Sequence, residues 1–148
     1  MNVRLPLAIC TCALVLASTP AAAGDLAPPE LAPPRANAPE GRTVSLLQNG
    51  VGNVFAVDQS GLNNAFTGSQ AGSANRSTVL QGGADNQASL QQDGQDNEAS
   101  IVQPGTRNRA GINQFGDFNF ARIEQYGHNG SAHITQHGNG KTATIIQY

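Results

Sequence analysis

Hydrophobic and polar residues alternate in short runs that recur every eleven residues along most of the chain. In one such run, Ala99, Ile101 and Gln103 alternate with Ser100 and Val102. Side chains of a β-strand point to opposite faces in turn, so the alanine, the isoleucine and the glutamine share one face. The pattern therefore predicts one short strand in each eleven-residue unit, with this face turned inward.

The predicted inward face carries the same residue types from unit to unit. Alanine fills the first inward position in the later units. The second inward position is the predicted aliphatic core, at Leu46, Val57, Val79, Leu90, Ile101, Ile112, Ile123, Ile134 and Ile145, and Gly68 is its one departure. The third inward position is glutamine in every unit, at Gln48, Gln59, Gln70, Gln81, Gln92, Gln103, Gln114, Gln125, Gln136 and Gln147.

Glycine and asparagine recur between the predicted strands. The glycines stand two residues after a glutamine, at Gly50, Gly61, Gly72, Gly83, Gly94, Gly105, Gly116, Gly127 and Gly138. The asparagines stand five residues after it, at Asn53, Asn64, Asn75, Asn86, Asn97, Asn108 and Asn119. Both residue types tolerate positive φ and both weaken a helix, so we expect the Gly-x-x-Asn segment to reverse the chain.

Two units of strand and turn make one flat coil of twenty-two residues, and ten strands make five stacked coils. The predicted fold is all-β, a β-solenoid that becomes amyloid-like cross-β in an assembled fibre. Alternate glutamines then form two columns, and each buried amide can donate to one neighbour and accept from the other. The less specific interpretation is that these glutamines are polar residues flanking turns.

Several positions depart from the repeat. Phe66 replaces the inward alanine beside Gly68, and we expect the glycine to make room for the ring. Gly130 and Lys141 stand where asparagine is expected, which predicts a looser turn column in the last coil.

The residues before the repeat have a different character. Residues 1–23 combine a basic start, an apolar run and an A-x-A ending, which predicts a secretory signal peptide cleaved after Ala23. An anchoring helix, or a metal site at Cys10 and Cys12, is the alternative. Residues 24–42 are rich in proline and predict a flexible leader that serves either as an export tag or as a spacer. The repeat domain is expected over residues 43–148.

Composition excludes several functions. With 39% hydrophobic and 12% charged residues the chain would suit disorder, but the regular repeat indicates a fold. A net charge of −2 argues against binding of nucleic acid. The cluster of His128, His133 and His137 lacks the spacing of metal ligands and is interpreted as surface histidines, so we expect no enzyme, metal or cofactor.

The unit Gln-x-Gly-x-x-Asn-x-Ala-x-x-x-Gln, which runs from Gln81 to Gln92 and recurs three times up to Gln125, resembles the curlin repeat of curli subunits. These subunits are bacterial functional amyloids of the biofilm matrix. The resemblance covers residues 43–148 and implies a secreted subunit that crosses an outer-membrane export channel. It further implies polymerisation with itself or a partner curlin at the cell surface, where the fibre supports adhesion to extracellular surfaces.

The ends of the stack bear on this expectation. No capping unit is recognisable after Gln147, and uncovered strand edges that meet head to tail are expected to generate a filament. The alternatives are a soluble secreted β-solenoid that binds ice, a surface or polysaccharide, and an adhesin that does not polymerise. The pattern leaves open whether the chain is a major or a nucleating subunit.

Overall fold

The computed structural model describes residues 41–148, and these residues form β-strands and turns without a helix. The predicted signal peptide and nearly all of the predicted leader lie outside the described residues. The strands are β1 (Thr43–Val51), β2 (Val54–Gln59), β3 (Ala65–Ser73), β4 (Arg76–Ala84), β5 (Gln87–Gln95), β6 (Glu98–Thr106), β7 (Arg109–Phe115), β8 (Phe120–Gln125), β9 (Gly127–His128), β10 (Ser131–His137) and β11 (Thr142–Gln147).

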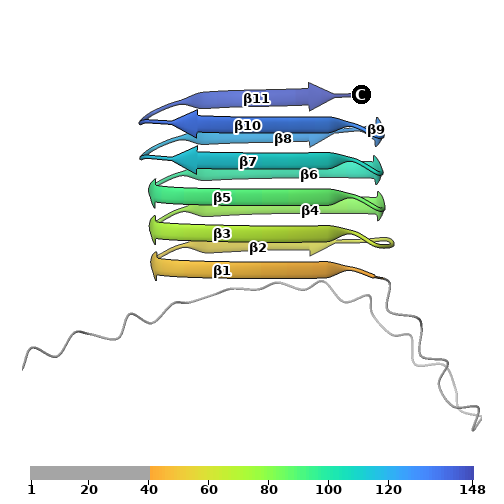
Figure 1. The fold of residues 1–148 in the computed structure, drawn as a ribbon, viewed down its shortest axis with the longest axis horizontal. Coiled ribbons are helices and arrows are strands. Elements are labelled where there is room, and N and C mark those ends of the chain that lie inside the picture. The colour runs from red at the N-terminus through yellow and green to blue at the C-terminus, as the bar shows by residue number, and fades with distance from the viewer. Residues whose placement is uncertain (1–40) are drawn as a thin grey trace, which may run out of the picture.

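The strands form two parallel sheets that the chain visits alternately (Figure 1). One sheet has the order β1-β3-β5-β7-β10 and the other the order β11-β8-β6-β4-β2. Every pairing joins equivalent residues one coil apart, as in Gln48 with Gln70 and Gln59 with Gln81. The β-solenoid of five coils is therefore confirmed.

One coil contains an additional short strand, which the repeat did not predict. Pairing between β6 and β8 stops at Val102 and Glu124, and it resumes between β6 and β9 at Gly105 and Gly127. The gap lies at Pro104, which has no backbone N–H with which to donate to the next coil. The eighth of the ten expected strands is thus split into β8 and β9 opposite this proline.

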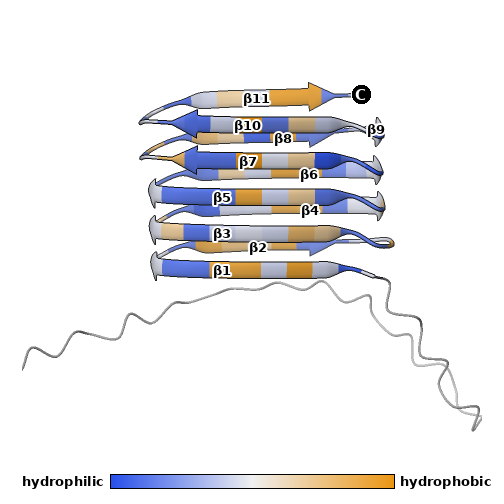
Figure 2. Ribbon diagram, in the orientation of Figure 1, coloured by the Kyte–Doolittle hydropathy of each residue, from blue (hydrophilic) through white to orange (hydrophobic). Residues whose placement is uncertain are grey.

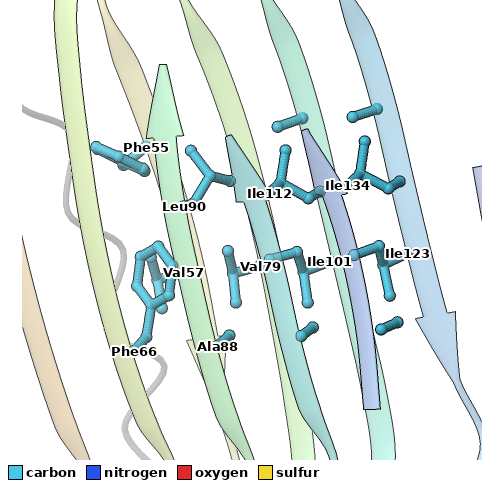
Figure 3. Close-up of a cluster of buried hydrophobic side chains, with 14 residues drawn as sticks. Phe55, Val57, Phe66, Val79, Ala88, Leu90, Ile101, Ile112, Ile123 and Ile134 are labelled. Atoms are coloured by element: carbon cyan, nitrogen blue, oxygen red, sulfur yellow. The ribbon is translucent and has the colours of Figure 1, made fainter. Parts of the chain in front are cut away.

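The core lies between the two sheets. Hydrophobic and hydrophilic residues alternate along the strands (Figure 2), and the inward aliphatic side chains stack in two columns (Figure 3). The aliphatic residues from Val57 to Ile134 are buried, whereas Leu46 and Ile145 in the two end coils are only partly buried. The core is therefore continuous along the stack and ends in partly covered side chains at both ends.

The turns use positive φ differently from the expectation. The glycine two residues after each glutamine has positive φ, and a Cβ on any of them from Gly50 to Gly116 would overlap the carbonyl oxygen of its equivalent one coil away. The ladder asparagines are not in this conformation. The residue before each one is, for example Ala74 at φ 56° and Phe118 at φ 58°. The reversal therefore rests on the glycine and on this preceding residue.

Gly68 leaves space for two aromatic rings. A Cβ at this position would lie 2.7 Å from Phe55 Cζ and 2.8 Å from Phe66 Cζ. The two rings meet edge to face, with centroids 5.9 Å apart and an interplanar angle of 69°. The expectation for Phe66 thus holds and extends to Phe55 on the opposite sheet.

Replacing Gly68 by alanine should lower the free energy of unfolding by about 1–3 kcal/mol, because the added methyl overpacks two buried rings. Denaturant unfolding followed by circular dichroism measures the change. Gly82→Ala is the matched control, because its Cβ would meet no atom closer than 3.5 Å. An equal loss of stability in the two variants would show that the effect comes from replacing a strand glycine in general, and not from overpacking of the two rings.

Candidate functional site

Two columns of glutamine amides run through the interior of the stack. In the first column, Gln48, Gln70, Gln92 and Gln114 each donate from Nε2 to Oε1 of the next glutamine at 2.7–2.9 Å, ending at Gln136. In the second, Gln59, Gln81, Gln103 and Gln125 do the same at 2.6–2.9 Å, ending at Gln147. All these bonds run toward higher residue numbers, so each ladder has a direction.

The second N–H of most of these amides reaches the opposite sheet. Gln92 donates to the carbonyl of Arg76 at 3.2 Å, and Gln103 donates to the carbonyl of Gln87 at 3.1 Å. Among the described residues, every buried side-chain nitrogen and oxygen has a hydrogen-bond partner. The amides therefore fix both the register within a sheet and the position of one sheet against the other.

Ser77 joins the first glutamine column from the other sheet. It occupies an inward alanine position of β4, accepts a hydrogen bond from Gln70 at 2.9 Å and donates to Gln92 at 2.7 Å. The hydroxyl of Ser77 stands where later units have the methyl of alanine, and it both donates and accepts a hydrogen bond. This residue was not recognised as part of the ladder from the sequence, because its hydrogen bonds reach glutamines of the other sheet.

The asparagine side chains form hydrogen bonds with the backbone of the turn in the following coil. Asn75 Oδ1 accepts from the backbone N–H of Asn97 at 3.1 Å, and its Nδ2 donates to the carbonyl of Gly94 at 2.9 Å. The same contacts support Gly130 and Lys141, whose N–H groups donate to Asn108 at 2.9 Å and Asn119 at 3.0 Å. The backbone N–H groups of the last coil's turns are therefore still held by the coil before. The missing asparagine side chains remove donations of the kind that Asn64 and Asn75 make to their own turns and to the next coil.

The two asparagine columns differ. In the first column, which starts at Asn53, the side-chain amides of Asn75, Asn97 and Asn119 each donate to the preceding ladder asparagine at 3.0–3.1 Å. In the column of Asn64, Asn86 and Asn108, the contacts from one asparagine to the next run from backbone N–H to Oδ1 at 3.0 Å. Only the first column is therefore a ladder of hydrogen bonds between asparagine side chains.

The two ends of the stack expose strand edges. Within residues 41–148, β1 and β2 have a neighbour on one side only, and so do β10 and β11. The N–H groups of Val54, Arg76, Glu98 and Phe120 each donate to a carbonyl of the next coil. By the same register the N–H of Thr142 faces the open edge of β11.

The three histidines lie apart on the outside of the stack. His128 contacts Thr106, His133 contacts Thr135, and the ring of His137 stacks on Phe115 with centroids 5.0 Å apart. Within residues 41–148, no group of acidic, histidine and cysteine side chains is arranged to hold a metal ion. The same residues include no helix of the length and apolarity needed to cross a bilayer.

Comparison with known proteins identifies the repeat. The family model of the Curlin associated repeat matches residues 94–127 and 119–148. A search of curated proteins finds no match. The matched residues extend from the end of β5 through β11, and the strands before them continue the same register.

Replacing Gln92 by alanine should lower the free energy of unfolding by at least about 3 kcal/mol. The buried polar groups of Gln70, Ser77 and Gln114 would each lose the hydrogen bond that they make with the Gln92 amide. Denaturant unfolding at fixed protein concentration measures the loss.

Gln91→Ala is the control, since Gln91 is the adjacent residue of β5 and is exposed. Its effect should stay within about 0.5 kcal/mol. Similar losses in the two variants would contradict a stabilising role of the buried amides.

Proposed function

The chain is a curlin repeat protein, and from this we propose that it is a secreted structural subunit of a curli-type amyloid fibre. Subunits add end to end at the bacterial cell surface, and the fibre supports adhesion and the biofilm matrix. The observation that carries the proposal is the in-register stack, whose end strands have a neighbour on one side only within residues 41–148. A partner curlin subunit and an outer-membrane export channel belong to the same proposal.

The register of the coils supports one way of stacking two copies. If β1 and β2 of a second copy continue the sheets beyond β10 and β11, Gln48 and Gln59 of that copy fall above Gln136 and Gln147. The direction of both ladders presents Nε2 donors of Gln136 and Gln147 to the incoming glutamines. A parallel contact of this kind repeats without closing and generates a filament.

The partly buried side chains of the end coils support the same contact. Val44 and Leu46 in the first coil and Ala143 and Ile145 in the last are packed against the core but only partly covered. Stacking a second copy would complete their burial and so add hydrophobic stabilisation to the backbone hydrogen bonds.

The contact between copies differs from the contact between coils in its turns. Within the chain, each ladder asparagine serves the turn of the following coil. At the end of the stack, Gly130 and Lys141 replace two such asparagines. The junction therefore depends on the glutamines and the strand backbones, and it is the weakest step of the stack.

Replacing Thr142 by proline should slow elongation at least about tenfold, because it removes an N–H that faces the open edge and places a ring where the next strand would pair. Thioflavin T fluorescence and electron microscopy of seeded growth measure the rate.

Thr142→Ala is the control and should elongate like the unmodified protein, and circular dichroism checks that each chain keeps its strands. A folded unmodified protein that neither binds the dye nor forms filaments would overturn the proposed fibre. So would a proline variant that elongates normally.

Replacing Lys141 by asparagine should speed elongation several-fold. The new amide could accept from the N–H of Asn53 in the next copy and donate to its Gly50 carbonyl, each worth about 0.5–1.5 kcal/mol. Lys141→Ala removes the charge without adding the amide and separates the two effects. If the alanine variant speeds growth as much as the asparagine variant, the missing amide does not limit the junction.

A further inference from the structure

The outer face of the second sheet carries the two tyrosines of the chain, Tyr126 and Tyr148, one coil apart. Their rings are stacked, with centroids 5.5 Å apart and an interplanar angle of 15°. Tyr126 is 39% exposed and Tyr148 is 96% exposed, so an oxidant reaches both rings from solvent.

A carboxylate accepts a hydrogen bond from one of the two phenols. Tyr126 donates from its hydroxyl to Glu124 Oε2 at 3.0 Å. The other oxygen of Glu124 is paired with Arg122, and only 7% of the Glu124 surface is exposed. The carboxylate is thus held in place by the arginine and directs one oxygen at the phenol.

The same hydrogen bond acts on the acidity of Tyr126. The bond to the Glu124 carboxylate, with smaller effects of desolvation and of the negative charge, raises the pKa of Tyr126 above its ordinary value. A phenol whose pKa is at or above its ordinary value is protonated at neutral pH, so the oxidation of Tyr126 requires that a proton leave together with the electron. Glu124 stands where that proton would go.

We propose that Tyr126 and Tyr148 are a site of oxidative coupling, at which a peroxide-driven one-electron oxidant joins the two rings as dityrosine within one chain. Each phenol loses one electron and its hydroxyl proton, and the proton of Tyr126 passes to Glu124. The two ring radicals form a carbon–carbon bond at their ortho positions. The hydrogen on each of these carbons then moves to the oxygen and restores the phenols. Overall, two phenols and one hydrogen peroxide give one dityrosine and two water molecules.

The cross-link would tie the last coil to the one before it. Tyr126 directly follows β8 and Tyr148 directly follows β11, and these two strands pair in register. β11 has one sheet neighbour in the described structure, so it depends on this pairing. A covalent bond across the pair limits the separation of the two strands and lowers the conformational entropy of the unfolded chain.

The test treats the folded full chain with hydrogen peroxide and a haem peroxidase, then dissolves it in strong denaturant. We expect dityrosine fluorescence in a product that migrates as a monomer and has lost two hydrogen atoms by intact mass. Peptide mapping should join the segments that contain Tyr126 and Tyr148. Tyr126→Phe and Tyr148→Phe should each abolish this product and leave only slow coupling between chains.

Two comparisons decide whether the folded geometry causes the reaction. The chain held unfolded in denaturant that the peroxidase tolerates should couple within the chain more slowly than the folded chain. Glu124→Gln keeps a hydrogen-bond acceptor but removes the base, and it should slow coupling roughly tenfold at neutral pH. Glu98→Gln, an exposed residue of β6, is the control and should have no effect.

The remaining outcomes would overturn the proposal. Coupling mainly between chains in the folded protein, or equal rates in the folded and unfolded chains, would contradict the assigned pairing of the rings. A Glu124→Gln variant that couples as fast as the Glu98→Gln control would contradict proton transfer to Glu124. Because the readout is a bond within one chain, it is independent of whether fibres form.

Discussion

Each buried glutamine amide is satisfied mainly by its own equivalent one coil away, and the stack depends on this constraint. Gln70 donates to Gln92, and Gln92 in turn donates to Gln114. A slip of one residue would place these amides against outward side chains and leave buried polar groups without partners, at about 1–3 kcal/mol each. The length of the repeat is therefore fixed by hydrogen bonding as firmly as by packing.

Close backbone approach is the second consequence of identical coils. A side chain at Gly72 or Gly83 would overlap the carbonyl of the next coil, so the turn column admits only glycine there. Inward positions are restricted in a related way, because bulky rings at Phe55 and Phe66 are accommodated only by the missing side chain at Gly68. The sequence is thus most constrained where successive coils meet.

The periodic features were predictable from the sequence, and most of the exceptions were not. The strands and the two glutamine columns follow from residues that recur at fixed phase, and the space at Gly68 follows from its position beside Phe66. The bridge made by Ser77 crosses between sheets, and the split at Pro104 depends on which backbone N–H faces the next coil. The positive φ before each ladder asparagine also escaped prediction, since residues as different as Ala74 and Phe118 adopt it. These features depend on the relation between coils and not on residue type alone.

The inward ladders leave the outer face free to acquire chemistry of its own. Outward positions make few of the contacts that fix the register, so residues at one row differ from coil to coil, as Ser60, Gly82, Pro104, Tyr126 and Tyr148 do. Yet the parallel register still places consecutive members of a row side by side. Two aromatic residues introduced one coil apart must therefore meet, as Tyr126 and Tyr148 do, and as Phe115 and His137 do on the other sheet. A fold that needs only its interior to repeat thus pairs whatever its exterior carries.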